Sequence, residues 1–587
     1  MSSLAAPRAI IAGQTGLVDH RRRALLVARL RLLLVILVFT LVALAALVKL
    51  AFIGVVQPGP AQQSMADALL PPRGEITDRN GVPLARAFPA YALWYNPDAM
   101  AEGGDGGPPL VASPAEVAAG LKAIFPDLDA YEVEQQLASG RPGYIRRRVL
   151  PEDANRVMAL GELALELPQE EDRHYPQGSM AAHVLGYVAA DGHGRVGMEQ
   201  VLDEQLMNPA TRGTPVALSI DMRVQGALED ELRSGMLAVN AVGAAGIVLD
   251  VDTGEVLALA SMPEFDPNQV VTEDVVLPES RTAAGEMPAS FNRMTNQVYE
   301  LGSTFKPLTV AMAIDAGEIT DLGRTWPADR PLIVGGNPIR DSHTIGARLN
   351  VPQTLMHSSN ITSAQIAQEV GGARMLEYLT QLGMAEPAYI ELPARGAPLG
   401  MRGDWNASKA AYAGFGHGIA VTPLHLASAY AAMVNGGIWR PATLHRIEPG
   451  QAPRGRRVFR ASTSARMNQL MRMIAVYGTG RNANAPGFRV GGKTGSAEKP
   501  GAGGYRRSTL VSTFAAAFPM DRPRFVIIAM LDEPQGTIAS SFQRTAAWNA
   551  APIVGRLVPR IGPQLGVMPD ATRDIDLSDL LPLVGEH

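Results

Sequence analysis

An apolar run near the amino terminus constrains this chain more than any other feature. Residues 32–48 contain no charged side chain, and after Lys49 the apolar sequence continues to residue 56. Because a helix rises ~1.5 Å per residue, residues 32–56 are long enough to cross the ~30 Å hydrocarbon core of a bilayer. A cleaved signal peptide and a buried core helix are the alternatives, but no cleavage site follows the run. The sequence therefore predicts one transmembrane anchor.

The distribution of charge predicts the orientation of this anchor. Residues 1–31 contain six arginines and one aspartate, a charge of about +5, whereas the whole chain carries −5. Cationic segments stay on the cytoplasmic side, so we expect residues 1–31 in the cytoplasm and everything after about residue 57 outside. The remainder is acidic and offers no basic surface for nucleic acid.

The residue types that are missing exclude several kinds of chemistry. The chain contains no cysteine, which excludes disulfides, thiol nucleophiles and cysteine-ligated zinc. Its ten histidines lack the paired spacing of a metal site. We therefore expect neither a metal nor a cofactor.

Beyond the anchor, the hydrophobic pattern changes at about residue 221. Residues 57–220 mix short strand-like and helical runs with many glycine and proline turns, and the sequence after residue 221 is more regular. Strand patterns at both ends of this second region predict a single sheet with helices between them. The expected helices cover residues 222–237, 307–316, 361–370 and 423–434. The expected strands are a hairpin over residues 244–262 and later runs over 488–493, 509–518 and 524–531.

Ser303 and Lys306 stand at the start of one expected helix. Proline is tolerated only in the first helical turn, so Pro307 predicts that the helix begins near Ser303. Residues three apart share a helix face, which places the Lys306 amine beside the Ser303 hydroxyl. A lysine can take the proton of a serine only when neutral, so burial or a second cation must lower its pKa. The pair supplies a nucleophile and a base.

A serine three residues before a lysine is common, and residues 496–499 repeat the pattern. Two further motifs, which follow the first pair in the sequence, make that pair specific. The Ser-x-Asn triplet of residues 358–360 (Ser-Ser-Asn) precedes another expected helix, although residues 290–292 match the same triplet. Residues 493–495 (Lys-Thr-Gly) lie in an expected edge strand. Gly495 would let a substrate backbone approach that strand. The three elements in this order are the signature of penicillin-binding proteins and class A β-lactamases.

With these motifs the chain resembles a class B penicillin-binding protein, a monofunctional peptidoglycan DD-transpeptidase. Further likeness lies in residues 73–81, 173–188 and 197–199, which are similar to the motifs of the family's pedestal, and in residues 415–418 and 421–423. We expect the pedestal motifs to be structural. The resemblance implies an α+β fold: a transmembrane helix, an elongated mixed α/β pedestal, and a penicillin-binding transpeptidase domain whose mainly antiparallel sheet is flanked by helices.

The domain boundaries follow from the resemblance and the pattern together. They are a basic cytoplasmic segment over 1–31, the anchor over 32–56, the pedestal over 57–220, the transpeptidase domain over 221–560 and a tail over 561–587.

The resemblance also implies the roles of the residues that act in acylation. Ser303 would attack the carbonyl of the D-Ala–D-Ala donor of a stem peptide, with Lys306 as the base. Ser358 would relay a proton to the leaving amine, and Asn360 would orient the lysine. An amine acceptor from a neighbouring stem peptide would then resolve the acyl-enzyme. A β-lactam would mimic the donor and acylate Ser303.

Residues of the expected edge strand would bind the donor. Lys493 would add positive potential, the Thr494 and Ser496 hydroxyls would hold the peptide carboxylate, and the N–H groups of Ser303 and Ser496 would form the oxyanion hole. Two positions depart from the commonest family pattern. Leu301 replaces a proline, which lowers loop rigidity, and Ser496 replaces a threonine, which keeps the hydroxyl.

The resemblance favours a septal, cell-division enzyme over an elongation enzyme, from residues 491–499 and the compact length. It implies a single-pass protein of the bacterial cytoplasmic (inner) membrane with its catalytic domain in the periplasm. The implied partners are a SEDS-type glycosyltransferase and other division proteins. A role mainly as scaffold or activator of that glycosyltransferase is an open alternative.

Other classes fit the sequence less well. A bifunctional class A enzyme needs a glycosyltransferase domain, for which residues 57–220 are short. A β-lactamase needs no anchor and requires a deacylating base that we do not find, and a β-lactam sensor needs a larger cytoplasmic module than residues 1–31.

Overall fold

The computed structural model describes residues 26–27, 29–44, 49, 71–99, 110–189, 191–283, 285–501 and 504–584. The chain divides into two units, Met1–Leu70 and Pro71–His587. In the first unit, residues 29–44 are helical. None of the helices within the described residues combines the length and apolar sequence that a bilayer crossing requires. The predicted anchor over 32–56 lies partly outside the described residues, which omit 45–48 and 50–56.

The first part of the second unit is built on one long strand, β2 (Pro83–Tyr95). This strand pairs antiparallel with each of its neighbours, whereas β1 and β6 pair in parallel. The neighbours and the parallel pair are β1 (Ile76–Thr77), β3 (Gly143–Val149), β4 (Leu165–Glu166), β5 (Gln169–His174) and β6 (Val216–Ala217).

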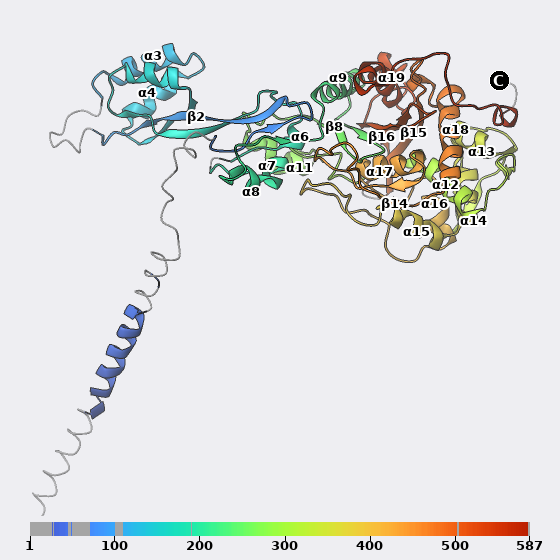
Figure 1. The fold of residues 1–587 in the computed structure, drawn as a ribbon, viewed down its shortest axis with the longest axis horizontal. Coiled ribbons are helices and arrows are strands. Elements are labelled where there is room, and N and C mark those ends of the chain that lie inside the picture. The colour runs from blue at the N-terminus through green and yellow to red at the C-terminus, as the bar shows by residue number, and fades with distance from the viewer. Residues whose placement is uncertain are drawn as a thin grey trace, which may run out of the picture. The chain divides into compact units, whose positions relative to one another are not determined.

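Two groups of helices accompany this sheet. The first group packs its apolar residues on Leu93 and Tyr95 of β2, and it consists of α3 (Pro114–Ile124), α4 (Ala130–Ala138) and α5 (Pro151–Met158). The second group carries parts of two of the motifs named above, and it consists of α6 (Ala182–Leu185), α7 (Gly197–Val201) and α8 (Asp203–Met207). Figure 1 labels these helices except α5.

The motifs assigned to the pedestal meet at a buried charge cluster. The Glu199 side chain is fully buried and accepts hydrogen bonds from Arg73 Nε at 2.8 Å and Arg173 Nε at 2.7 Å. Arg73 also donates to Asp203 Oδ1 at 2.7 Å, and Arg173 Nη1 donates to the carbonyl of Gly74 at 2.7 Å. These side chains join three segments that are distant in sequence, so the structural role expected for these motifs fits the contacts.

We expect Glu199→Gln to lower the free energy of unfolding of this region by about 3–5 kcal/mol, because it removes the described counter-charge of the buried Arg173 and leaves Arg73 with Asp203 alone. Hydrogen exchange of peptides from α7, measured across a urea series, would report this loss. Asp127→Asn is the matched control. Its carboxylate pairs with Arg146 but is 67% exposed, and exposed pairs contribute less than about 1 kcal/mol. Equal effects of the two changes would contradict the prediction.

The second part of the unit contains a five-stranded antiparallel sheet in the order β15-β16-β17-β7-β8. Two of its strands, β7 and β8, come early in the sequence, and the other three come late. A long, mainly helical region separates the two sets. The strands are β7 (Gly243–Asp250), β8 (Val256–Met262), β15 (Gly491–Gly501), β16 (Gly504–Phe518) and β17 (Phe525–Asp532). β15 therefore forms one edge of the sheet.

Helices cover both faces of this sheet. On one face, α9 (Met222–Ala238) and α19 (Ala550–Ile561) lie side by side, as Figure 1 shows, and pack on a core that includes Ile527. The other face carries the larger core, which includes Ile528. The helices on that side are α12 (Lys306–Ala316), α13 (Val351–His357), α14 (Asn360–Val370), α15 (Gly372–Gln381), α16 (Ala407–Ala413), α17 (Pro423–Val434) and α18 (Ala461–Tyr477).

Smaller elements occupy the connections. The helices among them are α10 (Thr272–Val275) and α11 (Glu279–Ala283), and the short strands form the pairs β9 (Trp326–Pro327) with β12 (Arg348–Leu349), β10 (Leu332–Val334) with β11 (Asn337–Ile339), and β13 (Ile438–Trp439) with β14 (Arg456–Arg457).

The predicted helices and strands of this part are confirmed, with shifts at some ends. The strand expected from residue 488 begins at Gly491, because Arg489 has a positive φ of 54° that breaks the extended run. The segment after residue 561 has little regular structure, as expected, yet it packs on the domain. Arg472 of α18 binds Asp574 at 2.6 Å, and Leu580 is buried.

Candidate active site

A cleft of about 650 Å³ lies at the edge of the five-stranded sheet. Segments from distant parts of the chain line it. They include Ser303, the junction of α13 and α14 at Ser358 and Asn360, the edge strand β15 at Thr494 and Ser496, the segment 415–417 and the segment 545–547. The structure therefore brings most of the residues predicted from the three motifs to one cavity.

Ser303 lies in a tight turn rather than in the helix itself. Residues Gly302–Phe305 form the 3-10 turn η2, and α12 begins at Lys306. Gly302 has a φ of 53°, a left-handed conformation that glycine adopts without strain. A Cβ on Gly416 would lie only 2.1 Å from the Gly302 carbonyl oxygen, so the segment around Gly416 presses directly on this turn.

Two buried lysines converge on one hydroxyl beneath the cleft. Nζ of Lys306 lies within hydrogen-bond distance of Ser358 O, of Ser358 Oγ at 3.1 Å and of Asn360 Oδ1 at 2.7 Å. Nζ of Lys493 lies 2.9 Å from the same Ser358 Oγ. Among the described contacts of Lys306, none is a hydrogen bond to Ser303, so the lysine is held by the Ser-x-Asn element.

The surroundings of Lys306 favour its neutral form. Burial first, and then the neighbouring Lys493, lower the pKa of Lys306 well below its usual value, against an opposing effect of Asp341. Burial lowers the pKa of Lys493 to about 7. A lysine base needs a depressed pKa, and the two causes expected from the sequence, burial and a second cation, both act on Lys306.

The hydrogen bonds form one consistent pattern if Lys306 is neutral and Lys493 is charged. A neutral amine has two N–H donors and one lone pair. Lys306 then donates to Ser358 O and Asn360 Oδ1 and accepts from the Ser358 hydroxyl, which accepts in turn from Lys493. Ser358 is thereby placed as a link through which a proton can pass between the lysines.

The backbone places Ser358 at this point with some strain. Ser358 ends α13 in a left-handed conformation with a φ of 61°, which is uncommon for a residue other than glycine. Such conformations cost about 1–3 kcal/mol and are held in place by the surrounding structure. Here Asp341 provides part of that support, since its carboxylate accepts hydrogen bonds from Ser359 Oγ at 2.7 Å and from the N–H groups that begin α14.

Between Lys493 and Ser496, the edge strand β15 presents its residues alternately to the interior and to the cleft. Thr494 and Ser496 line the cleft, and their hydroxyls bind Thr479 Oγ1 at 2.9 Å and the N–H of Ala546 at 3.0 Å. Gly495 faces the interior, where an added Cβ would lie 2.5 Å from Leu301 O. The loop that precedes Ser303 thus approaches β15 closely at this glycine, and the approach of a substrate backbone there stays a prediction.

The second Ser-x-x-Lys pattern differs in its electrostatics. Lys499 lies 2.8 Å from Asp532 and 2.8 Å from Glu533. Burial favours its neutral form, but these carboxylates outweigh burial and raise the pKa of Lys499. The pKa of this lysine is thus shifted in the direction opposite to that of Lys306, and the decoy pattern lacks the depressed pKa that a lysine base requires.

Sequence reasoning missed several residues of the cleft. Asp341 and Thr479 support the Ser-x-Asn and Lys-Thr-Gly elements, yet no pattern around either residue signals that role. Glu300 and His417 also meet at the cleft, with His417 Nδ1 and Glu300 Oε2 3.2 Å apart. The sequence singled out the glycine-rich segment that contains His417, but only as a resemblance.

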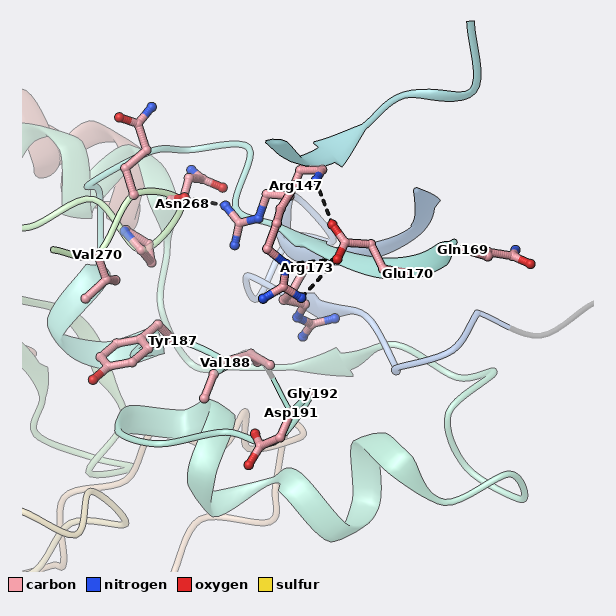
Figure 2. A pocket seen from close by; sticks show the side chains of 14 residues that line it. Arg147, Gln169, Glu170, Arg173, Tyr187, Val188, Asp191, Gly192, Asn268 and Val270 are labelled. Atoms are coloured by element: carbon pink, nitrogen blue, oxygen red, sulfur yellow. Dashed lines mark hydrogen bonds and ion pairs between the residues drawn. The ribbon is translucent and has the colours of Figure 1, made fainter. Parts of the chain in front are cut away.

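A second pocket of about 660 Å³ lies beside β3 and β5. Figure 2 shows Arg147 and Glu170 directed at each other within it, 2.9 Å apart. Arg148 pairs with Asp172 at 2.9 Å, so the charges here are largely compensated. Its described lining contains no serine, threonine or lysine that would act as nucleophile or base.

Comparisons with known proteins agree with this arrangement. Residues 244–557 match the penicillin binding protein transpeptidase domain, and residues 68–208 match the penicillin-binding protein dimerisation domain. The chain is 38% identical over 507 residues to the probable peptidoglycan D,D-transpeptidase FtsI of Caulobacter vibrioides, covering 84% of this chain and 82% of that protein. It is 28% identical over 538 residues to the peptidoglycan D,D-transpeptidase FtsI of Escherichia coli, covering 88% and 87%.

Solved structures show the same fold. Penicillin binding protein 3 of Mycobacterium tuberculosis, in complex with aztreonam, superimposes with a TM-score of 0.63 at 23% identity, over 85% of this chain and 98% of that one. The matched domains cover more than half of the sequence, and the relatives align along most of their length. This chain belongs to the class B penicillin-binding protein family.

Proposed function

We propose that this chain is a peptidoglycan DD-transpeptidase that crosslinks stem peptides through an acyl-enzyme on Ser303. One observation carries the proposal: Lys306 and Lys493, both fully buried, meet at the Ser358 hydroxyl directly behind the cleft that contains Ser303. A nucleophile, a lysine with a depressed pKa and a proton relay are the parts that acyl transfer requires.

In the acylation step, Ser303 Oγ attacks the carbonyl carbon between the two D-alanines of the donor. Lys306 accepts the serine proton, and the relay through Ser358 delivers a proton to the leaving D-alanine amine. Asn360 holds Lys306 by its Oδ1. The N–H groups of Ser303 and Ser496 stabilise the oxyanion, a contribution of about 3–4 kcal/mol for each donor in other acyl-transferases.

Donor binding uses the edge strand. The Thr494 and Ser496 hydroxyls hold the terminal carboxylate, and Lys493 supplies positive potential behind them. Gly495 acts indirectly, because its missing side chain lets β15 lie against the serine loop. β-Lactams enter the same site and acylate Ser303.

The cellular setting follows from the relatives and the sequence. We assign the chain to the division septum because its relatives include proteins named FtsI. Residues 32–56 anchor it in the inner membrane, with 1–31 in the cytoplasm, the pedestal over 57–220, the transpeptidase domain over 221–560 and the tail over 561–587. A SEDS-type glycosyltransferase and other division proteins are its partners.

Mass spectrometry of the full chain after incubation with penicillin tests this function. The expected result is one added penicillin per chain, located on the peptide that contains Ser303. A thioester analogue of the donor should also be transferred to D-alanine as acceptor. An adduct on Ser496 or Ser290, or the absence of any adduct on folded protein, would overturn the assignment.

A further inference from the structure

A histidine held by a carboxylate lines the wall of the cleft. Nδ1 of His417 lies 3.2 Å from Glu300 Oε2, and Glu300 Oε1 accepts a hydrogen bond from the N–H of Gly418 at 3.0 Å. His417 shares this cleft with Ser303, and its neighbour Gly416 presses on the turn that carries the serine. The imidazole therefore belongs to the immediate surroundings of the nucleophile.

The orientation of this ring suits a base. Its plane stacks on Phe415, with the ring centres 5.8 Å apart and an angle of 20° between the planes. The Glu300 carboxylate lies on the Nδ1 side of the ring, and the tautomer with its proton on Nδ1 carries the lone pair on Nε2. A histidine beside a carboxylate recurs as the general base of serine hydrolases. The His417 side chain is 37% exposed, so a proton taken up there can leave to solvent.

A second cavity gives the acceptor a route to this base. A cavity of about 340 Å³ adjoins the cleft, since Glu498 lines both. Glu300 and Gly418 form part of its wall. Glu300 and Glu498 favour a cation at this junction, since the charge of Lys499, which also lines the cavity, is compensated by Asp532 and Glu533. The amine that resolves the acyl-enzyme is an ammonium ion at neutral pH.

We propose that His417 is the general base that deprotonates the acceptor amine in transpeptidation, and that Glu300 positions it. The inference rests on the proposed function and deepens it. Lys306, which Ser358 and Asn360 hold, returns a proton to Ser303 in this step, so the first proton of the acceptor ammonium requires a second base that lines the same cleft. His417 is that group.

The step balances as follows. Nε2 of His417 takes one proton from the acceptor ammonium, which becomes a free amine, and the imidazolium releases that proton to water. The amine nitrogen then forms a bond to the acyl carbon, and the bond from that carbon to Ser303 Oγ breaks. The second amine proton passes through Ser358 and Lys306 to Ser303 Oγ, which restores the hydroxyl.

The test separates acylation from aminolysis in the full-length chain. Acylation is followed with a fluorescent penicillin, and aminolysis by the transfer of a thioester donor to D-alanine. His417→Gln should leave penicillin acylation unchanged and lower the rate of aminolysis by about 100-fold, within the range measured for general bases. Glu300→Gln should also lower the rate of aminolysis, by a smaller factor, and leave penicillin acylation unchanged. His445→Gln, on an exposed histidine, is the matched control and should change neither rate.

A pH series adds a readout that a purely structural role would not change. The deficit of His417→Gln should shrink as the pH approaches the pKa of the acceptor amine, because free amine then forms without a base. Other titratable groups line the cleft and remain in both proteins, so their effects cancel in the ratio of variant to parent: Arg340, Asp341, His343, His357 and Glu498.

The outcomes are distinguishable. Equal losses of acylation and aminolysis would show that His417 only shapes the cleft, and unchanged aminolysis would place the base elsewhere; either result overturns this inference while leaving the proposed function intact. A parent protein that penicillin does not acylate would instead overturn the proposed function.

Discussion

Ser303→Ala is expected to abolish covalent labelling by a fluorescent penicillin while the domain remains folded. The hydroxyl is the only group that the change removes, and the turn that carries it is shaped by Gly302 and by the contact with Gly416 rather than by the serine side chain. The measurement is in-gel fluorescence after denaturation, with circular dichroism to confirm folding.

Ser290→Ala is the matched control for this experiment. Ser290 belongs to the other Ser-x-Asn triplet, residues 290–292, and lies outside the cleft, where its N–H binds the carbonyl of Asp274 at 2.9 Å. Labelling of this variant should equal that of the parent. Persistent labelling of Ser303→Ala would place the nucleophile at another residue.

Lys306→Met should slow penicillin acylation by about 10²–10⁴-fold, the contribution of a general base. Methionine fills a similar volume without an amine, so the buried space remains occupied while the base and its hydrogen bonds to Asn360 and Ser358 are lost. Stopped-flow measurement of the acylation rate constant under saturating penicillin would report the effect on the chemical step.

The contrast with Lys499→Met makes this prediction specific. Lys499 ends the second Ser-x-x-Lys pattern, and the carboxylates of Asp532 and Glu533 keep it charged. Its replacement should lower stability modestly through the loss of these ion pairs and leave the acylation rate constant near that of the parent. Similar rate losses in the two variants would argue against Lys306 as the base.

The sequence predicted the parts of this site that depend on local structure. Pro307 located the helix start within a few residues, and the three motifs identified the side chains that meet in the cleft. Local pattern could not distinguish Lys306 from Lys499, because their difference comes from Asp532 and Glu533, which β17 brings to Lys499 from more than 30 residues away.

Long-range contacts also explain what sequence reasoning missed. Asp341 supports Ser359 and the start of α14 across a separation of 18 residues, and Glu300 reaches Gly418 across 118 residues. Neither partner is indicated by spacing or hydropathy, since each contact exists only after the domain has folded. The sequence also does not reveal that the loop before Ser303 occupies the space where a side chain of residue 495 would lie.

The buried lysines also link the stability of the domain to pH. An unfolded chain keeps the proton of a lysine up to a pKa of ~10.4, whereas burial lowers the pKa of Lys493 in the folded chain to about 7. Between these values the unfolded chain binds more protons than the folded chain, so this group makes folding more favourable as the pH rises and less favourable as it falls. Lys306 acts in the same direction. The amines that prepare the nucleophile therefore cost the fold more stability at neutral pH than at alkaline pH, and the Lys493 contribution stops changing below about pH 7, where folded and unfolded chains both hold the proton.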